Sequence, residues 1–405
     1  MRIPKNIKER KQYISRIVPF MKQSIIKVLT GQRRVGKSYM LFQLIEKIQN
    51  EEPDASVIYI NCENFEFESI RTAIDLHQYI ESRREPGRLN YIFIDEIQEI
   101  EDFEKALRSL VLNEENDIYV TGSNAHLLSG ELGTYLSGRY VEFKIYSLSY
   151  PEFLQFHELS DSFQSYDKYC RYGGLPYLVN LALRDEIVDD YLQSVYSAII
   201  FRDVVARYKV RNIAFLEKLI QFLAENTGSL FSAKNISDYL KSQRVTISVN
   251  QIQTYVSHLV NAFLIHRVER YDMVGKRIFE VGEKYYFENL GLRNTIIGYR
   301  ITDKAKILEN VVYNHLLYDG YKINIGYNGN KEIDFICEKA SEKLYVQVAL
   351  KLNAEKTIER EFGNLLKIPD NFPKIVVSED DFSGNTYKGI RHYSIRDFLM
   401  HRAPK

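Results

Sequence analysis

Gly31-Gln-Arg-Arg-Val-Gly-Lys-Ser38 matches the pattern GxxxxGK[ST] at every defined position. The run Ser24–Thr30 before it predicts a short buried strand, and apolar residues at helical spacing predict a helix over 37–49. Between such elements, two glycines let backbone N–H groups approach a phosphate at the positive end of the helix dipole. The expected nucleotide-binding residues are Gly31, Gln32, Arg33, Arg34, Val35, Gly36, Lys37, Ser38 and Tyr39.

Lys37 and Ser38 have the most specific roles in this loop. The Lys37 ammonium is expected to reach the β- and γ-phosphates of ATP, and the Ser38 hydroxyl is expected to bind Mg²⁺. We also expect Lys37 to face solvent, where a ligand can meet it. The alternative is a chance match in an arginine-rich loop, and the flanking strand and helix weigh against it.

A second motif, Tyr91-Ile-Phe-Ile-Asp-Glu-Ile-Gln98, predicts a buried strand that ends in two acids. In an open α/β sheet, ligands bind at the carboxyl ends of the strands. We therefore expect Asp95 to hold Mg²⁺ and Glu96 to orient or deprotonate the attacking water. Two acids that simply meet solvent are the alternative.

Two further strand ends supply candidate catalytic groups. The run 117–123 predicts a strand, and Ser123 or Asn124 at its end can contact the γ-phosphate or the water if this strand lies between the other two. Arg139 precedes a later strand, and an arginine can stabilise charge on the phosphoryl group of its own nucleotide or a neighbour's. A surface arginine is the alternative interpretation.

Residues 1–148 alternate between strands and helices. Besides the elements above, strands are predicted over 56–61 and 140–144, and helices over 69–82 and 103–113. Such alternation predicts a mostly parallel sheet covered on both faces.

Beyond Leu148 the pattern changes three times. Residues 149–212 predict helices only, as in a helical lid or connector. Residues 213–282 predict helices followed by a hairpin around Gly275, the outline of a winged helix. Residues 283–405 predict a helix, three strands, a helix and a strand, which indicates a separate α/β domain.

The winged-helix segment offers groups that suit DNA. Gln251, Thr254 and His258 lie along one predicted helical stripe, with Lys276 and Arg277 at the tip of the wing. A packing module between the nucleotide-binding domain and an effector is an equal alternative, because the segment carries no strong basic patch.

The overall composition limits the possible partners. Lys+Arg and Asp+Glu both number 54, so any site for a polyanion must be a local patch. The sequence shows no signal peptide and no apolar run of about 18 residues, so we expect a cytoplasmic protein without a membrane partner. We expect Cys62, Cys170 and Cys337 to be reduced thiols, and the eight histidines form no metal-binding spacing.

The motifs GQRRVGKS, YIFIDEIQ, YVTGSNAHLL, LSGRY and Gly173-Gly-Leu-Pro176 together resemble the STAND-like group of archaeal and bacterial AAA-type ATPases. Their order resembles, more specifically, a prokaryotic family that joins such an ATPase to a C-terminal domain of unknown function with a restriction-endonuclease-like fold. The resemblance runs from about Arg16 to Asp380. It implies conformational switching driven by ATP and defines no physiological role.

A residue check makes a nuclease unlikely in the C-terminal domain. The endonuclease-like pattern needs an acid on the first helix, an acid on a strand and Glu/Asp-x-Lys on the next strand. Glu309 and Asp334 fit the first two positions, whereas Gln347 and Ala349 stand where the third motif needs an acid and a lysine. The candidate replacements are Lys351, Glu359 and Glu361. We expect a catalytically degenerate domain that binds DNA or protein.

These expectations combine into an α/β P-loop ATPase that uses ATP and Mg²⁺ and acts as a molecular switch on its C-terminal domains. A platform that binds nucleotide with little turnover and an ATP-regulated DNA endonuclease are the alternatives. Glu96 favours turnover over mere binding. DNA, another protein and a second copy of the chain all remain open as partners.

Overall fold

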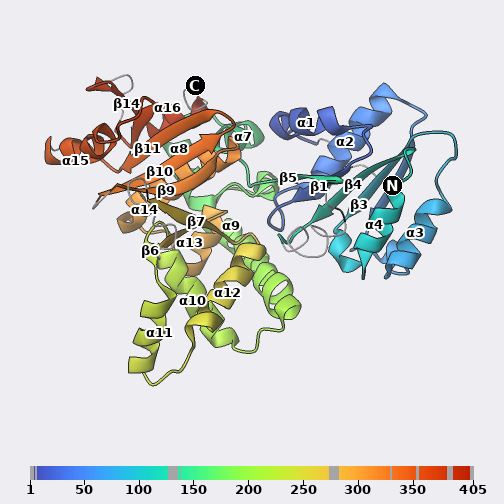
Figure 1. Cartoon of the computed structure of the whole chain (residues 1–405), viewed down its shortest axis with the longest axis horizontal. Helices are drawn as coiled ribbons and strands as arrows, with labels where there is room; N and C mark the ends of the chain where they lie inside the picture. The colour runs from blue at the N-terminus through green and yellow to red at the C-terminus, as the bar shows by residue number, and fades with distance from the viewer. Residues whose placement is uncertain are drawn as a thin grey trace. The chain divides into compact units, whose positions relative to one another are not determined.

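The computed structural model describes residues 4, 7–125, 136, 138–272, 282–328, 331–352, 355–380 and 386–401. The chain divides into two compact units, coloured by residue number in Figure 1. The first unit is Met1–Tyr146 with Asn261–Phe263, and the second is Ser147–Val260 with Leu264–Lys405. The first division lies two residues before the boundary expected after Leu148.

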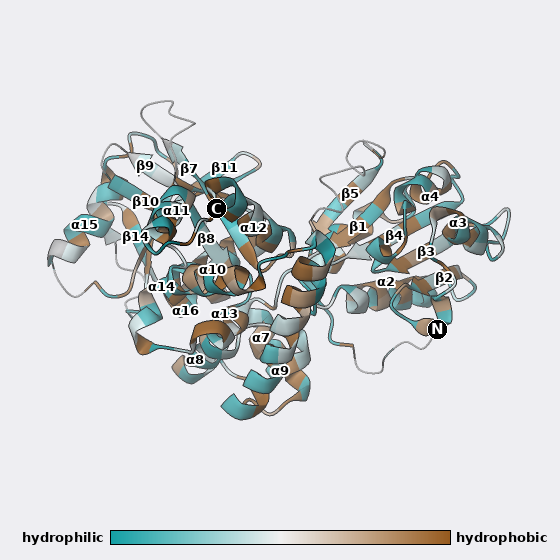
Figure 2. Cartoon of the chain, turned by 90° about the horizontal axis from the view of Figure 1, so that it is seen from below, coloured by the Kyte–Doolittle hydropathy of each residue, from teal (hydrophilic) through white to brown (hydrophobic). Residues whose placement is uncertain are grey.

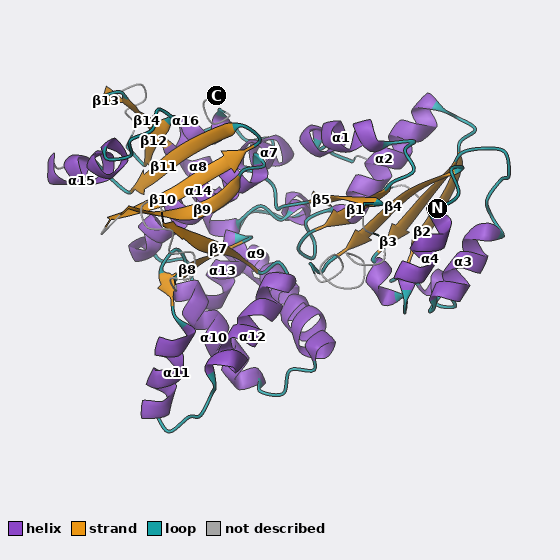
Figure 3. Ribbon diagram, in the orientation of Figure 1, coloured by secondary structure: helices purple, strands orange, loops and turns teal. Residues whose placement is uncertain are grey.

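The first unit is built on a five-stranded parallel sheet with the order β2-β3-β4-β1-β5 (Figure 3). Its strands are β1 (Ile26–Thr30), β2 (Ser56–Asn61), β3 (Asn90–Asp95), β4 (Asn116–Gly122) and β5 (Tyr140–Lys144). The predicted parallel sheet is therefore confirmed. Because β4 lies between β1 and β3, its end separates the phosphate-loop motif from the paired acids, as the sequence suggested.

Helices cover both faces of this sheet (Figure 1). On one side lie α1 (Lys11–Ile17) and α2 (Lys37–Glu51), and on the other α3 (Ala73–Glu81) and α4 (Phe103–Leu110). Strands β1 and β3 are fully buried and largely hydrophobic in Figure 2. Short 3₁₀ turns complete the unit: η1 (Val18–Phe20), η2 (Phe65–Phe67) and η3 (Ile97–Glu99).

The second unit begins with helices, as predicted. They are α7 (Tyr150–His157), α8 (Phe163–Tyr172), the 3₁₀ turn η4 (Pro176–Asn180), α9 (Asp185–Ala198) and α10 (Ile213–Glu225). Within the segment predicted to be helical, α9 is continued by a π-helical segment, η5 (Ile199–Ala206).

The region expected to be a winged helix has the predicted order of elements. It contains β6 (Leu230–Phe231), α11 (Ala233–Ser242), α12 (Val249–Asn261), β7 (Ile265–Asp272) and β8 (Glu283–Phe287). The expected wing residues Gly275, Lys276 and Arg277 lie outside the described residues.

The C-terminal elements include the predicted helix, three strands, helix and strand, with an unpredicted helix before this series and two unpredicted strands and a helix after it. They are α13 (Leu290–Ile297), η6 (Ile301–Asp303), α14 (Lys304–Tyr318), β9 (Lys322–Asn328), β10 (Lys331–Lys339), β11 (Glu342–Ala349), α15 (Glu355–Leu366), β12 (Lys374–Ser378), β13 (Thr386–Tyr387), β14 (Ile390–Ser394) and α16 (Ile395–Met400). Strands β9, β10 and β11 are antiparallel neighbours, and β12 runs parallel to β11.

One nine-stranded sheet joins the two regions that were expected to be separate domains. Its order is β13-β14-β12-β11-β10-β9-β7-β8-β6, and β7 pairs in parallel with β9. The expected boundary at 282/283 is corrected, because β8 pairs with both β7 and β6 and so belongs to the hairpin. Tertiary pairing of this kind leaves no local mark in the sequence.

The Gly-Gly-Leu-Pro motif has a packing role. Gly173 has a φ of +71°, and a Cβ there would lie 2.3 Å from Asn289 Oδ1. At Gly174 a Cβ would lie 2.3 Å from the carbonyl oxygen of Leu148. Both glycines therefore let the turn after α8 pack closely within the second unit.

Within the described residues, no helix is long and apolar enough to cross a membrane. The three cysteines are free, with Cys170 and Cys337 buried.

Candidate functional site

The phosphate-loop motif lies between β1 and α2, as the sequence predicted. Gly31 has a φ of +149°, and a Cβ at this position would lie 2.1 Å from the carbonyl oxygen of Ile145. Gly36 has a φ of +96° and precedes the first residue of α2. A side chain is therefore sterically excluded at Gly31 and disfavoured by the positive φ at Gly36, the two positions where the backbone must turn around a phosphate.

The Lys37 side chain is buried, which corrects the expectation that it faces solvent. The residue is only 4% exposed. Its Nζ donates to the carbonyl oxygens of Gly31 and Gln32, both at 3.1 Å, and lies 3.6 Å from Glu96 Oε1. The ammonium thus lies at the centre of the loop, in contact with the second motif.

Asp95 at the end of β3 is held by hydroxyl groups. Its Oδ1 accepts a hydrogen bond from Thr121 Oγ1 at 2.6 Å, and its Oδ2 accepts one from the Tyr59 hydroxyl at 3.3 Å. Ser38 also hydrogen-bonds to this carboxyl group. Burial raises the pKa of Asp95 above its ordinary value, although Thr121 and Ser38 oppose the shift. The two residues expected to bind Mg²⁺ are therefore in contact.

Glu96 has the electrostatic environment of an ionised base. Burial alone would raise its pKa, but Lys37, a hydrogen bond from Gln98 and the charge of Arg33 outweigh burial, so that the pKa lies below its ordinary value. The residue adopts a φ of +55°, which is uncommon outside glycine. Strained backbone of this kind is typical of functional sites.

Ser123 and Asn124 lie near this pair of acids, following β4. Both are almost completely buried, and Ser123 hydrogen-bonds to Glu96 and accepts from Gln98 Nε2 at 3.4 Å. Ser123 is therefore in contact with Glu96 and Gln98 of the second motif. A role in sensing the γ-phosphate stays a prediction.

Thr121 is a site residue that the sequence reasoning missed. Besides bonding to Asp95, its Oγ1 accepts a hydrogen bond from the Glu96 backbone N–H at 2.9 Å. One hydroxyl therefore positions both acids. The only available signal was a threonine near the end of a strand predicted to lie beside β3.

Arg10 is a second missed residue, and it supports the loop from the N-terminal segment. The residue is 3% exposed, and its Nη1 donates to the carbonyl oxygens of Val35 at 3.2 Å and Tyr146 at 2.8 Å. No motif in the sequence marks it.

The remaining loop residues differ in exposure. Gln32, Arg33 and Val35 are buried, and Arg33 forms an ion pair with Glu63 at 3.1 Å. Arg34 and Tyr39 are exposed.

Arg139 does not lie with the other candidates. It is exposed and precedes β5, at the end where Tyr140 pairs with Ile26, whereas Thr30 before the phosphate loop pairs with Lys144. Four residue steps of about 3.3 Å separate the two ends of β5 by ~13 Å. Arg139 therefore lies at the amino-terminal end of the parallel strands, whereas Lys37 follows their carboxyl end.

The stripe expected to contact DNA is partly used for packing. The His258 ring stacks on Tyr208 with centroids 3.8 Å apart and planes at 10°. Thr254 is exposed, and its hydroxyl donates to the carbonyl oxygen of Asn250. His258 is thus a packing residue rather than a freely presented contact.

The residues of the expected degenerate nuclease site surround a lysine that was not predicted. Lys284 on β8 has its Nζ 3.0 Å from Glu309 Oε1 and 2.6 Å from Glu332 Oε1. The Tyr286 hydroxyl donates to Glu309, and Asp334 Oδ2 accepts from the backbone N–H of Val348. The sequence suggested only Lys351 as a replacement lysine, because the contacts of Lys284 with Glu309 and Glu332 join segments far apart in the chain.

The charges of this cluster are strongly coupled. Burial and the charge of Glu309 raise the pKa of Asp334 well above its ordinary value, although Lys284 opposes them. Burial alone would lower the pKa of Lys284, but the carboxylates outweigh burial and raise the pKa.

Gln347 and Ala349 on β11 are both buried, and Gln347 Oε1 has no hydrogen-bond partner among the described residues. Glu361 on α15 is 4% exposed and pairs with Arg360. Over the described part of the chain, no group of three acidic, histidine or cysteine residues is arranged to hold a metal ion.

Comparison with known proteins agrees with the geometry of the first site. Residues 23–154 match the family model of an AAA domain, and residues 163–303 match that of a domain of unknown function. The second match covers most of the expected connector and the whole expected winged-helix region, but only residues 283–303 of the expected C-terminal domain.

Several solved structures show a weak likeness. The replication initiator DnaA bound to AMPPCP and single-stranded DNA has 13% identity and a TM-score of 0.30, covering 63% of this chain and 90% of its own. The Drosophila ORC structure with AT-rich DNA and Cdc6 has 10% identity and a TM-score of 0.24, covering 70% and 89%.

Two relatives match over most of the chain. An uncharacterized protein of Haemophilus influenzae is 38% identical over 398 residues, which cover 96% of this chain and 98% of that protein. An uncharacterized protein of Methanocaldococcus jannaschii is 30% identical over 356 residues, covering 83% and 77%. The chain therefore belongs to the same family as these two proteins, and its residues 23–154 match an AAA domain.

Proposed function

We propose that the chain binds ATP with Mg²⁺, hydrolyses it, and couples its nucleotide state to rearrangement of its C-terminal regions. The observation that carries this proposal is the convergence of Lys37, Asp95 and Glu96 at one edge of the parallel sheet. The AAA-domain match over 23–154 supports nucleotide binding.

The residues at this edge fit Mg²⁺. Ser38 and Asp95 present a hydroxyl and a carboxylate, which are hard oxygen ligands of the kind that Mg²⁺ prefers. When bound, the ion would neutralise charge on the β- and γ-phosphates.

The chain's own groups perform the remaining steps of the proposed reaction. Lys37 exchanges its contacts with the carbonyl oxygens of Gly31 and Gln32 for phosphate oxygens. Glu96, held ionised by Lys37, accepts a proton from the attacking water. Ser123 and Asn124 at the end of β4 orient the γ-phosphate or this water.

Arg139 acts on the nucleotide of a neighbouring copy in this proposal. It lies at the amino-terminal end of β5, ~13 Å along the strand from the end that carries the phosphate loop, and this favours action between copies over action within one chain. A homo-oligomer is the partner that this position requires.

The C-terminal regions provide the surfaces that respond. We assign a winged helix to the segment from α10 to β8 and a restriction-endonuclease-like fold to α14 through β12, because the order of elements and the strand pairing suit both. These surfaces bind DNA or protein.

Nuclease activity is the less favoured alternative. Lys284 already forms ion pairs with Glu309 and Glu332, so these carboxylates are engaged by an internal cation. A nucleotide-dependent platform with little turnover remains the second candidate, favoured only if Glu96 is not the base.

One experiment separates these functions. Phosphate release and plasmid nicking are measured side by side for the wild type and Glu96→Gln, with and without DNA. We expect ATP-dependent phosphate release without nicking, and a fall of about 10²- to 10⁴-fold in the variant while ATP still binds. Glu99→Gln, an exposed glutamate three residues later, is the matched control.

Release at the wild-type rate by Glu96→Gln would exclude this residue as the base. Absence of release from the wild type would favour the platform, and Mg²⁺-dependent nicking would favour the nuclease.

A further inference from the structure

Tyr59 connects the edge strand of the first sheet to the acid proposed to hold Mg²⁺. In the register of β2 and β3, Asn61 pairs with Asp95, and Tyr59 lies two residues earlier on the same face of β2. This offset lets the long side chain reach along the sheet, and its hydroxyl donates to Asp95 Oδ2 at 3.3 Å.

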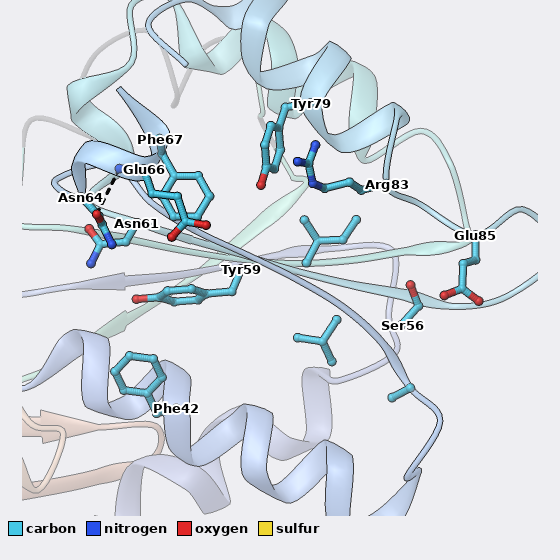
Figure 4. Close-up of a pocket in the computed structure, with 13 residues that line it drawn as sticks. Phe42, Ser56, Tyr59, Asn61, Asn64, Glu66, Phe67, Tyr79, Arg83 and Glu85 are labelled. Carbon is cyan, nitrogen blue, oxygen red and sulfur yellow. Dashed lines mark hydrogen bonds between the residues drawn. The ribbon is translucent and has the colours of Figure 1, made fainter. Parts of the chain in front are cut away.

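The Tyr59 ring belongs to the wall of a groove rather than to the core. Together with Phe42, Phe67, Tyr79 and Arg83 it lines a groove of about 990 Å³ along β2 (Figure 4). The ring packs against Phe42 with centroids 5.4 Å apart. Because β2 is an edge strand, no further strand in the described part of the chain pairs with it on this side.

The Asp95 carboxylate is fixed from two sides. Thr121 donates to Oδ1 from β4, and Tyr59 donates to Oδ2 from β2. A carboxylate can accept about four hydrogen bonds, so the hydroxyl groups of Thr121, Tyr59 and Ser38 orient it and leave a lone pair for a cation or its water. Thr121 and Tyr59 come from strands on opposite sides of β3.

We infer that Tyr59 is a positioning residue, which orients Asp95 for Mg²⁺ through its hydroxyl group. The inference rests on the proposed function, in which Asp95 holds the ion. Tyr59 belongs neither to the phosphate-loop motif nor to the motif of the paired acids, so neither motif assigns it a role.

The test is Tyr59→Phe, which removes the hydroxyl and keeps the ring that packs on Phe42. Calorimetry measures the affinity of the full chain for ATP in Mg²⁺ and in EDTA. We expect the gain in ATP affinity from Mg²⁺ to fall about three- to tenfold in the variant. The loss is modest because a 3.3 Å contact is long for a hydroxyl donor. The ATP affinity in EDTA should stay unchanged. Phosphate release should need a correspondingly higher Mg²⁺ concentration.

Tyr79→Phe is the matched control. Tyr79 lines the same groove, but its hydroxyl has no recorded bond to Asp95, so this variant should keep the full gain from Mg²⁺.

Three results would overturn the inference: an unchanged gain from Mg²⁺ in Tyr59→Phe, an equal loss in Tyr79→Phe, or an equal fall in Mg²⁺ and in EDTA. The last result would make Tyr59 a structural residue of the whole nucleotide site. A wild type that binds no ATP in either buffer refutes the proposed function itself, which distinguishes the two failures.

Discussion

Replacing Lys284 by methionine removes a cation that pairs with both Glu309 and Glu332, at a position where its side chain is 5% exposed. Deleting one partner of a buried ion pair typically costs about 3–5 kcal/mol, because the other charges remain buried without compensation. The Glu309 and Glu332 side chains are 19% and 32% exposed, so water screens part of this loss. We expect a destabilisation of about 2–4 kcal/mol at pH 8.

The cost of this substitution should depend on pH. Burial already raises the pKa of Asp334, and the charge of Lys284 opposes this shift more strongly than the hydrogen bond from the Val348 backbone does. Without the ammonium, the folded-state pKa of Asp334 rises further above its unfolded value. The folded variant then binds more protons than the unfolded chain, so its stability increases as the pH falls toward the unfolded pKa of about 4. The penalty should be smaller at pH 5.5 than at pH 8.

Urea unfolding followed by circular dichroism, at both pH values, measures the effect. Lys343→Met is the control, because Lys343 lies 3.6 Å from Glu338 in a pair whose side chains are 20% and 49% exposed. Such a pair contributes at most about 1 kcal/mol. The reasoning fails if Lys284→Met costs no more than this control, or if its cost is the same at both pH values.

Two further predictions concern the nucleotide site. Lys37→Ala should weaken ATP binding strongly, because the ammonium at the centre of the loop is lost, and equal calorimetric affinities for variant and wild type would refute the assignment of the site. Arg139→Ala should lose turnover alone but regain it when mixed with Lys37→Ala, since each then supplies what the other lacks. Mixtures without recovery would contradict action between copies.

The first unit was predictable because its signals are local. Each strand of the sheet is a short apolar run, and the predicted limits agree with β2 and β5 and differ by one or two residues for the others. The loop and the paired acids are contiguous motifs whose flanking elements follow from periodicity. In the second unit, apolar residues at helical spacing likewise mark α10, α14 and α15.

Contacts between distant elements could not be predicted in this way. The pairing of β7 with β9 merges two expected domains into one sheet. The Lys284 cluster combines a hairpin strand, a helix and a later strand, so no spacing in the sequence relates its members. Lys37 was expected to face solvent because the sequence does not reveal how the loop folds around this side chain. In the structure, Lys37 donates hydrogen bonds to carbonyl oxygens of the loop itself.

The contrast between the buried lysines Lys37 and Lys284 explains why chemistry is proposed for one unit and not for the other. Lys37 donates to two neutral carbonyl oxygens and lies 3.6 Å from the Glu96 carboxylate. Hydrogen bonds to neutral carbonyl oxygens contribute only about 1 kcal/mol each, so a multiply charged phosphate can replace them. Lys284 instead contacts two carboxylates, at 3.0 Å and 2.6 Å, and its removal leaves their charges uncompensated. An incoming ligand can therefore recruit Lys37, whereas displacing Lys284 requires the folded structure to lose stability.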